Sequence, residues 1–412
     1  MDIKAINLIS PVHDAKSIEE SLVGFISRIE SLVGGKFTDV PHETLSAGGP
    51  VVLFVKSGGV EGIFRNLCEG VRGPFFILAP GANNSLPAAM EILAYIRSGG
   101  KEGEIIHGTP DYCATRLKSV SAASGALESV RGRRLGIIGK PSDWLISCGV
   151  DYAVVQKKLG VELVDIEMDE LLSAIAAVGT SGHGLIEKFS GKWPGRAKSS
   201  VSGEIISALR ICTALEKISL ARGLSGFTIR CFDLLGTVKT TGCLALAIMN
   251  SGWSACGERF VAGCEGDVPA IISMFILNSI TGAPSFMANP SSVDVSLGRA
   301  VFAHCTVPLS MTDKYVLDTH FESGIGVAVR GKIREGEATV FRIGSDIASH
   351  YAGAAKIVRN PEEKNLCRTQ IELDFRSGTD YFLKNPLGNH HVVCQGDYTS
   401  EADDFMKMIN FC

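Results

Sequence analysis

The segment A-G-C-E-G-D at residues 262–267 places two carboxylates, Glu265 and Asp267, directly before the apolar run V-P-A-I-I-S-M-F-I-L-N-S-I. Carboxylates in such a position can cap a helix, bind a cation or transfer protons. Asp267 stands where the N-cap of a helix is expected, because Pro269 favours the first helical turn. The pattern leaves capping and catalysis as equal alternatives for Asp267, whereas Glu265 would gain from the helix dipole even without a metal.

Histidines form the second group of residues with chemical potential. Five of the nine lie in the last third of the chain, at positions 304, 320, 350, 390 and 391. A single histidine is more often a core or surface residue than a ligand, which is our interpretation of His350. The pair in G-N-H-H-V-V (388–393) leads into a strand-like run, in which successive side chains point to opposite faces. Only one of these two imidazoles is therefore expected to face a given cavity.

Composition limits the classes of protein to which such a site can belong. The chain has 412 residues, of which 45% are hydrophobic and 20% charged, enough for two or three domains. A net charge of -4 supplies no basic field, so a nucleic-acid partner is disfavoured. The N-terminus lacks the pattern of a signal peptide, and no apolar run approaches the length of a membrane span. We therefore expect a cytoplasmic protein with no membrane partner.

The twelve cysteines are scattered without a C-x-x-C pair, a pattern that indicates neither a zinc ribbon nor a secreted disulfide framework. We interpret most of them as small buried hydrophobic residues.

The elements that must position these residues follow an α/β pattern. Short apolar runs such as V-V-L-F-V-K (51–56) alternate with helical stretches, which is typical of an open parallel sheet covered by helices. The alternation begins again at L-G-I-I-G (135–139), and from F-T-I-R-C-F (227–232) onward glycines and short strands become more frequent. We predict two doubly wound parallel-sheet domains followed by a β-rich domain. The predicted boundaries are 1–127, 128–225 and 226–412.

Four motifs in the last third, taken in order, resemble those of the metal-dependent L-fucose and L-arabinose isomerases. They are G-C-E-G-D (263–267), S-F-M-A-N-P (285–290), F-A-H-C-T-V-P (302–308) and L-G-N-H-H-V-V (387–393). The rest of the chain resembles these enzymes only in its organisation. The resemblance implies two flavodoxin-like domains and a C-terminal, barrel-like domain that carries a divalent-metal site.

The resemblance also implies roles for individual residues. Glu265 matches the first metal-binding carboxylate, which is also a proton-transfer group, and His391 matches the histidine ligand. His304 falls where the arabinose enzymes have a further histidine near the metal. The family's second carboxylate corresponds to position 289, which is Asn289 in this chain. This departure puts an amide where the resemblance implies an acid.

An amide at position 289 keeps an oxygen ligand for a hard cation but removes one charge and one possible base. We therefore expect a lower metal affinity and a different second proton carrier, for which His304, Asp267 and Glu322 are alternatives. Mn²⁺ is the ion that the resemblance implies, and carboxylate, amide and imidazole ligands together suit it. The residues predicted to bind substrate are His304, His320, Glu322, Asn389, Ser142 and Trp144.

The predicted function is that of an aldose-ketose isomerase that acts on an open-chain sugar through an enediol. In this prediction Glu265, Asp267 and His304 are catalytic, and Glu265, Asn289 and His391 bind the metal. The resemblance also implies a homo-oligomer, trimeric or hexameric, because active sites of these enzymes lie between subunits. Two alternatives stay open: a lyase or epimerase acting on a related sugar derivative, and a sugar-binding protein of the same fold that has no catalytic activity.

Overall fold

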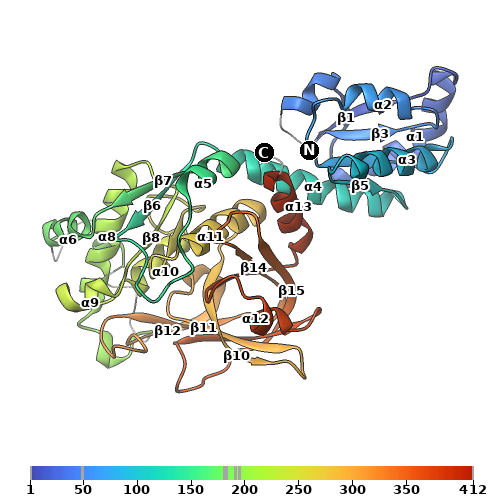
Figure 1. The fold of residues 1–412 in the computed structure, drawn as a ribbon. Helices are drawn as coiled ribbons and strands as arrows, with labels where there is room; N and C mark the ends of the chain where they lie inside the picture. The colour runs from blue at the N-terminus through green and yellow to red at the C-terminus, as the bar shows by residue number, and fades with distance from the viewer. Residues whose placement is uncertain (1, 48–50, 180–183, 190–192, 194–195, 411–412) are drawn as a thin grey trace. The chain divides into compact units, whose positions relative to one another are not determined.

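The computed structural model describes residues 2–47, 51–179, 184–189, 193 and 196–410 (Figure 1). The chain divides into two compact units, Met1–Glu128 with Asp403–Cys412, and Ser129–Ala402. Cys412, one of the cysteines discussed above, lies outside the described residues. The other cysteines are buried or half-buried free thiols, as the sequence predicts.

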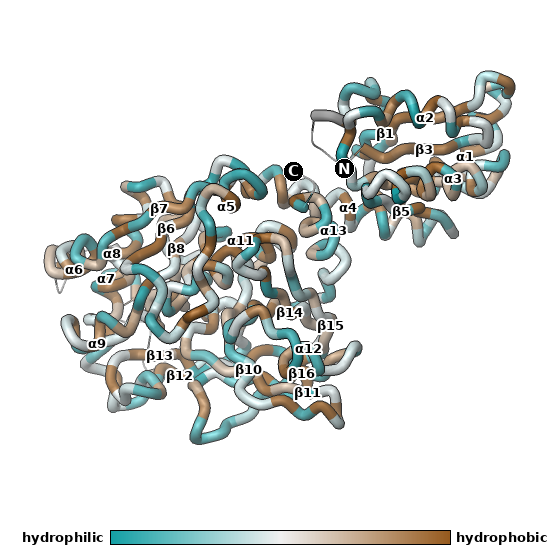
Figure 2. The backbone as a smooth tube through the Cα atoms, in the orientation of Figure 1, coloured by the Kyte–Doolittle hydropathy of each residue, from teal (hydrophilic) through white to brown (hydrophobic). Residues whose placement is uncertain are grey.

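The first unit is built on a five-stranded parallel sheet with the order β2-β1-β3-β4-β5. This is the order of a doubly wound sheet, in which strands are added first on one side of β1 and then, from β3 onward, on the other. The central strand β3 has the sequence V-L-F-V, is buried throughout, and is among the most hydrophobic segments of the unit in Figure 2. The bounds are β1 Ile3–Leu8, α1 Ala15–Val33, β2 Phe37–Asp39, β3 Val52–Val55, α2 Glu61–Leu67, β4 Phe75–Leu78, α3 Ser85–Ser98, β5 Gly103–Ile106, α4 Pro110–Val130 and α13 Thr399–Asn410.

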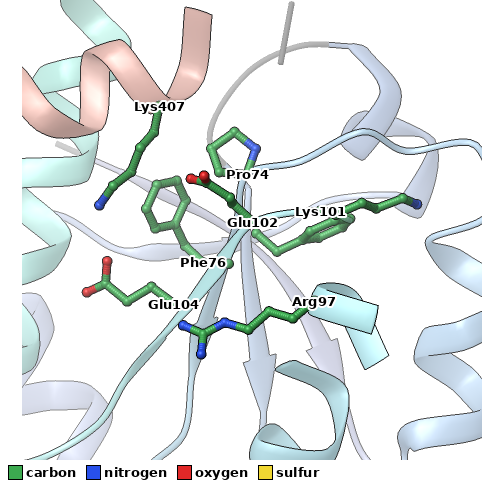
Figure 3. A pocket seen from close by; sticks show the side chains of 9 residues that line it. Pro74, Phe76, Arg97, Lys101, Glu102, Glu104 and Lys407 are labelled. Carbon is green, nitrogen blue, oxygen red and sulfur yellow. The ribbon is translucent and has the colours of Figure 1, made fainter. Parts of the chain in front are cut away.

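The C-terminal helix α13 is joined to this unit by a buried ion-pair cluster. Arg116 of α4 donates to Glu104 at 2.7 Å and to Asp404 of α13 at 2.6 Å. Beside this cluster, where β4 and β5 begin, lies a cavity of about 300 Å³ (Figure 3). Its lining mixes basic and acidic side chains, and it contains none of the site residues predicted from the sequence. The side chains labelled there are Pro74, Phe76, Arg97, Lys101, Glu102, Glu104 and Lys407.

The second unit begins with a four-stranded parallel sheet of order β7-β6-β8-β9. Its strands are separated by helices, as the alternating sequence pattern predicts. The bounds are β6 Arg134–Ile138, α5 Tyr152–Leu159, β7 Glu162–Ile166, α6 Met168–Ala177, α7 Gly184–Phe189, α8 Ile205–Ala221, β8 Gly226–Ile229, α9 Asp233–Thr237, α10 Cys243–Asn250 and β9 Val261–Gly263.

A closed antiparallel barrel of order β10-β11-β16-β15-β14-β17 completes the second unit, together with the hairpin β12-β13. The mixed α/β architecture with two parallel sheets and a barrel confirms the predicted class of fold. The bounds are β10 Phe286–Asp294, β11 Arg299–His304, β12 Thr312–Asp318, β13 Ala328–Ile333, β14 Gly336–Ile343, β15 His350–Arg359, β16 Thr369–Phe375, α12 Asp380–Lys384 and β17 His391–Gln395.

Helix α11, Val268–Thr281, connects the second sheet to the barrel. It is apolar on all sides and contacts β8 and β9 of the sheet as well as β14 and β17 of the barrel. A helix that is hydrophobic all round is stable only when it is buried on all sides, which explains its central place in this unit. The two carboxylates at its N-terminus are therefore held where the sheet meets the barrel.

The second sheet extends beyond residue 225, at which the sequence analysis ended the second α/β domain. Strands β8 and β9 both follow that position, yet they pair in parallel with β6 and with each other. The shift in composition after 225 reflects the short helices α9 and α10 and the coming barrel, and not the end of the parallel sheet. The division into three domains stays a prediction. No helix in the described parts of the chain is long and apolar enough to cross a membrane.

Candidate functional site

The candidate site lies at the carboxyl ends of β6 and β9, where open α/β sheets usually bind ligands. Glu265 follows β9, and its backbone oxygen accepts a hydrogen bond from the backbone N–H of Ser142 at 3.0 Å, in the turn after β6. A side chain at Gly266 would meet the backbone oxygen of Lys140 at 2.5 Å, so only glycine permits this approach. Glu265 itself has a φ of 61°, a strained conformation for a non-glycine residue that is common at functional sites.

The carboxylate of Glu265 is largely buried and lies among hydrogen-bond donors. Its Oε2 accepts a hydrogen bond from Nε1 of Trp144 at 2.8 Å. Its Oε1 lies 3.4 Å from Nε2 of His390 and 3.8 Å from Nε2 of His304. Burial alone would raise the pKa of Glu265, but the two imidazoles outweigh burial and hold this pKa far below its usual value. At neutral pH Glu265 is therefore an anion that faces two ring nitrogens.

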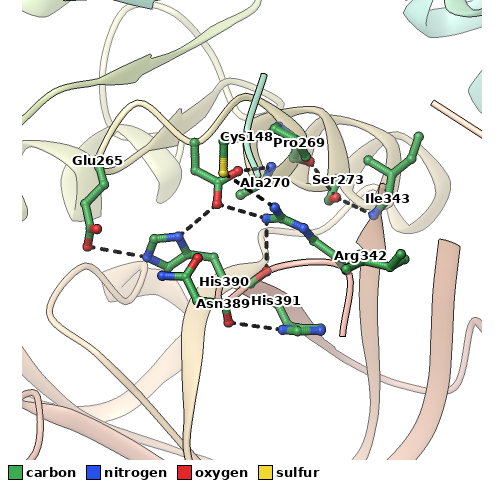
Figure 4. A network of polar contacts seen from close by, with 12 residues as sticks. Cys148, Glu265, Pro269, Ala270, Ser273, Arg342, Ile343, Asn389, His390 and His391 are labelled. Carbon is green, nitrogen blue, oxygen red and sulfur yellow. Dashed lines mark hydrogen bonds and ion pairs between the residues drawn. The ribbon is translucent and has the colours of Figure 1, made fainter. Parts of the chain in front are cut away.

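Asp267 caps helix α11, which confirms the capping interpretation. Its Oδ1 accepts from the backbone N–H of Ala270 at 2.8 Å. Its Oδ2 lies 2.9 Å from Nδ1 of His390 and 3.0 Å from a guanidinium nitrogen of Arg342 (Figure 4). The side chain is fully buried, and both oxygens are engaged. The geometry thus favours an indirect role for Asp267, and its predicted catalytic role stays a prediction.

The adjacent histidines point to opposite sides, and it is His390 that the structure brings to Glu265. His391, which the resemblance implied as the ligand, has its Nε2 3.0 Å from the hydroxyl of Tyr381 and its Nδ1 3.2 Å from the backbone oxygen of Asn389. Its ring also packs edge-on against Phe302. The alternation predicted that the two imidazoles point to opposite sides, but it could not tell which of them faces Glu265.

The two histidines differ in charge as well as in orientation. Burial alone would lower the pKa of His390, but its contacts with Asp267 and Glu265 outweigh burial and raise it to about 9. For His391, burial and the positive charge of Arg342 lower the pKa to about 3. Without a metal, His390 is a buried cation between two carboxylates, whereas His391 is neutral.

His304, at the end of β11, completes the group around Glu265. Its Nδ1 lies 2.8 Å from the hydroxyl of Thr306, which leaves Nε2 directed to Glu265. Burial lowers the pKa of His304, so its imidazole is neutral and available as a ligand. The thiol of Cys264 also belongs to this group, because one ligand atom each of Cys264, Glu265 and His304 lie within 4.8 Å of one another.

Asn289 is on barrel strand β10, next to Ala288, which pairs with His391 of the antiparallel strand β17. The same register, continued by one residue, would bring Asn289 opposite His390 and onto the same face. The amide oxygen Oδ1 of Asn289 is buried and has no hydrogen-bond partner among the described residues. A buried acceptor without a partner is uncommon and indicates an unseen donor or cation.

The predicted substrate-binding residues occupy two places. Trp144 packs edge-on against Phe232 at 5.0 Å, and Phe232 against His320 at 5.7 Å, forming a wall beside Glu265. Glu322 follows His320 in the loop between β12 and β13, and its pKa is raised by burial and by the negative charge of Glu265. Asn389 lines a separate cavity of about 720 Å³ together with His391.

Two residues of the site were not found by sequence reasoning. One is His390, which the double-histidine motif contains but to which the resemblance assigns no role. The other is Arg342, the one charged residue in the buried strand segment T-V-F-R-I-G (339–344). A single arginine inside an apolar strand requires a buried anion, which is the signal that could have found it.

The donor set fits a divalent cation. Glu265 and Asn289 offer oxygen, and His304 and His390 offer Nε2. Nε2 of His390 is buried without a hydrogen-bond partner within the described part of the chain, while Nδ1 is held by Asp267. Histidine ligands in metal sites characteristically use one nitrogen for the metal and the other for a carboxylate. These residues therefore have the chemistry and the orientation of metal ligands.

Asp318, two residues before His320, forms a group of ion pairs that provides a test of stability. Asp318 is buried and lies 2.6 Å from Nζ of Lys198 and 3.1 Å from Arg330. Burial would raise the pKa of Asp318, but these two cations outweigh it and lower the pKa below the usual 3.8. A lowered folded-state pKa stabilises the protein above the usual pKa, and this stability is lost as the pH falls through the folded-state pKa.

We expect Asp318→Asn to lower the free energy of unfolding at pH 7 by about 2 kcal/mol, because charged hydrogen bonds are lost. The difference from the parent should shrink as the pH falls below about 4, where the unfolded parent begins to take up a proton at Asp318, and it should vanish below the lower folded-state pKa. Urea unfolding at pH 7 and at pH 3.5 measures both effects. Asp313→Asn, an exposed position on the same strand β12, serves as the control. Equal midpoints for the parent and Asp318→Asn at pH 7 would contradict this role.

Comparison with known proteins gives the site a chemical context. No protein-family model matches the chain. The sulfoquinovose isomerase of Priestia megaterium is 22% identical over 98% of this chain and 90% of its own length. That of Alkalicoccus urumqiensis is 20% identical over 79% of this chain and 75% of its own length. A shorter match, 30% identical over 33% of this chain, is to the sulfoquinovose isomerase of a Clostridium species.

These relatives carry the name of one activity, the isomerisation of a sugar. The similarity confirms the prediction that this chain is an enzyme, and it supports the prediction of a sugar isomerase.

Proposed function

We propose that the chain is a metal-dependent aldose-ketose isomerase whose site consists of Glu265, His304, His390 and Asn289. The observation that carries the proposal is the convergence of one largely buried carboxylate with two imidazole Nε2 atoms, at 3.4 and 3.8 Å. The relatives named as isomerases over most of both chains support the same reaction. Mn²⁺ is the ion we propose, since mixed oxygen and nitrogen ligands suit it.

The reaction moves a proton between neighbouring carbons of an open-chain sugar and a second proton between their oxygens. A bound cation would supply polarisation of the carbonyl and of the adjacent hydroxyl. Trp144 holds one oxygen of Glu265, so the other oxygen has a fixed direction toward the ligands and the reacting carbons. The aromatic wall of Trp144, Phe232 and His320 provides an apolar side against which a sugar can pack.

Glu322 is our candidate for the second proton carrier. Asp267 has both oxygens engaged, and Asn289 cannot take up a proton, so the missing acid must come from another element. Glu322 lies two residues after His320 of the wall, and partial burial and the charge of Glu265 raise its pKa. A raised pKa brings a carboxylate nearer to the range in which it both gives and takes protons.

We expect Glu322→Gln to lower kcat by about 100-fold, a usual contribution of a single general acid or base, with Mn²⁺ affinity unchanged. Steady-state kinetics with parallel Mn²⁺ titration checks both values. Glu335→Gln, at an exposed position of the same unit, is the matched control. A Glu322→Gln enzyme with the kcat of the parent would assign the second proton transfer to His304 instead.

The proposed substrate is a six-carbon aldose with an anionic end, as sulfoquinovose carries a sulfonate on its terminal carbon. The test is incubation of the protein and Mn²⁺ in D₂O with sulfoquinovose, glucose, L-fucose or L-arabinose, followed by chromatographic separation and mass spectrometry. We expect a ketose from sulfoquinovose, with one deuterium from solvent for each exchanged proton. Saturable binding of a sugar without any ketose would instead support the sugar-binding protein. Sedimentation of the purified protein tests the proposed homo-oligomer.

A further inference from the structure

Arg342 on barrel strand β14 is the largest fully buried side chain of the described residues, with no exposed surface. A buried guanidinium is unfavourable unless its N–H groups find anionic or carbonyl partners. One terminal nitrogen lies 3.0 Å from Oδ2 of Asp267 and donates, also at 3.0 Å, to the backbone oxygen of His390. The other lies 3.9 Å from the thiol of Cys148. Arg342 therefore acts on His390 at two points. It donates directly to the backbone oxygen, and it holds Asp267, which in turn contacts the ring.

These contacts form one row of alternating charge (Figure 4). The row runs from Arg342 to Asp267 at 3.0 Å, from Asp267 to Nδ1 of His390 at 2.9 Å, and from Nε2 of His390 to Glu265 at 3.4 Å. Asp267 is also fixed by the backbone of Ala270 at the start of α11. The imidazole consequently has one orientation, with Nδ1 toward Asp267 and Nε2 toward Glu265.

The chain beside His390 is adapted to the guanidinium. A side chain at Gly388 would meet a terminal nitrogen of Arg342 at 2.5 Å, and the φ of Gly388 is 151°. Glycine at this position lets the backbone of residues 388–390 pass close to Arg342, so that the backbone oxygen of His390 accepts a hydrogen bond from the guanidinium. The arrangement needs the planar, forked guanidinium, because the ammonium of lysine is a compact point charge without this geometry.

We infer that Arg342 is a positioning residue that fixes His390 as a metal ligand, and so sets the affinity of the site for a divalent cation. The inference rests on the proposed function, since it concerns the same site. Arg342 acts through Asp267 and the backbone of His390, and it does not itself touch the substrate. Carboxylates behind histidine ligands typically change metal affinity by about 10- to 100-fold when removed, so loss of the residue that fixes such a carboxylate should have a comparable effect.

The test compares Arg342→Gln and Arg342→Lys with the parent by Mn²⁺ titration, following free Mn²⁺ by electron paramagnetic resonance. Arg116→Gln and Arg116→Lys are the matched controls, because Arg116 is a largely buried arginine bonded to carboxylates, in the other unit. Thermal unfolding in chelator records stability for all variants. We expect both Arg342 variants to bind Mn²⁺ about 10-fold more weakly or worse, including the lysine variant that keeps the charge. Both Arg116 variants should bind as the parent does, even where they are less stable.

A second measurement covers the case in which Arg342→Gln does not fold. The imidazole Nδ1–H resonance of His390 in the chelated, ¹⁵N-histidine-labelled protein should be present in the parent and lost or shifted in Arg342→Lys. Parent-like Mn²⁺ affinity in a folded Arg342 variant would overturn the inference, as would an unchanged His390 resonance. A parent that binds no Mn²⁺ would refute the proposed metal site, and the resonance alone would then decide the role of Arg342.

Discussion

Replacing Glu265 with glutamine is expected to lower kcat of the proposed isomerisation by about 1,000-fold, because one side chain loses both its charge and its basicity. Glu265 is the only anion that faces the Nε2 atoms of His304 and His390 in the described structure. Its amide analogue keeps the size of the side chain and one oxygen. The change therefore removes the chemistry of the site and leaves its shape almost unaltered.

The measurement is the initial rate of ketose formation at saturating Mn²⁺, so that weaker metal binding does not mask the loss of proton transfer. Glu258→Gln, an exposed position in the loop before β9, is the control and should keep the rate of the parent. A Glu265→Gln enzyme that retains one tenth of the parental rate or more would exclude Glu265 as the main proton carrier.

The second large effect distinguishes the two adjacent histidines. His390→Ala is expected to weaken Mn²⁺ binding by at least about 100-fold, because it removes a ligand and leaves Asp267 with one partner fewer. His391→Ala should instead lower the free energy of unfolding by about 2–4 kcal/mol, since it leaves a cavity in an aromatic cluster around Phe302 and Tyr381. Its Mn²⁺ affinity should stay close to that of the parent.

Isothermal titration with Mn²⁺ and thermal unfolding in chelator, carried out on both variants, separate the two roles. The resemblance to the fucose and arabinose isomerases implies the reverse result, with His391 as the ligand. Loss of Mn²⁺ binding in His391→Ala, with binding kept in His390→Ala, would show that the side chains exchange places when the metal binds. The two histidines thus serve as controls for each other.

The sequence predicted the parts of the site that depend on local pattern. The cap at Asp267 follows from Pro269 and the apolar run, and the structure confirms it. The α/β class follows from the alternation of short apolar runs with helices, and it is also confirmed. These features depend on neighbouring residues, so a single chain is enough to predict them.

Features that depend on strand register could not be predicted in this way. Which of His390 and His391 faces Glu265 is decided by the pairing of Ala288 with His391 in the barrel, and a shift by one residue would exchange them. Arg342 lies 75 residues from its partner Asp267, and no local pattern joins the two. The sheet continues past residue 225 because β8 and β9 pair with strands far back in the sequence.

Asn289, which stands where the resemblance implies an acid, lowers the negative charge that faces the proposed metal. The site has one carboxylate directed at the proposed metal, Glu265, and a second, Asp267, that is neutralised by Arg342. With Asn289 in place of an acid, the negative charge that faces a cation is small, so a weaker metal affinity is expected than for a site with two free carboxylates. The fixed orientation of His390, which Asp267 and Arg342 maintain, offsets part of this loss of metal affinity.

The measurement that tests the central claim most directly is the metal content of protein purified without chelator. Inductively coupled plasma mass spectrometry of the parent, Glu265→Gln and His390→Ala, before and after dialysis against Mn²⁺, provides it. We predict about one Mn²⁺ per chain in the dialysed parent, because the structure offers one set of ligands, and a large loss in both variants. A dialysed parent without metal, or variants that hold as much as the parent, would contradict a metal site at Glu265 and His390.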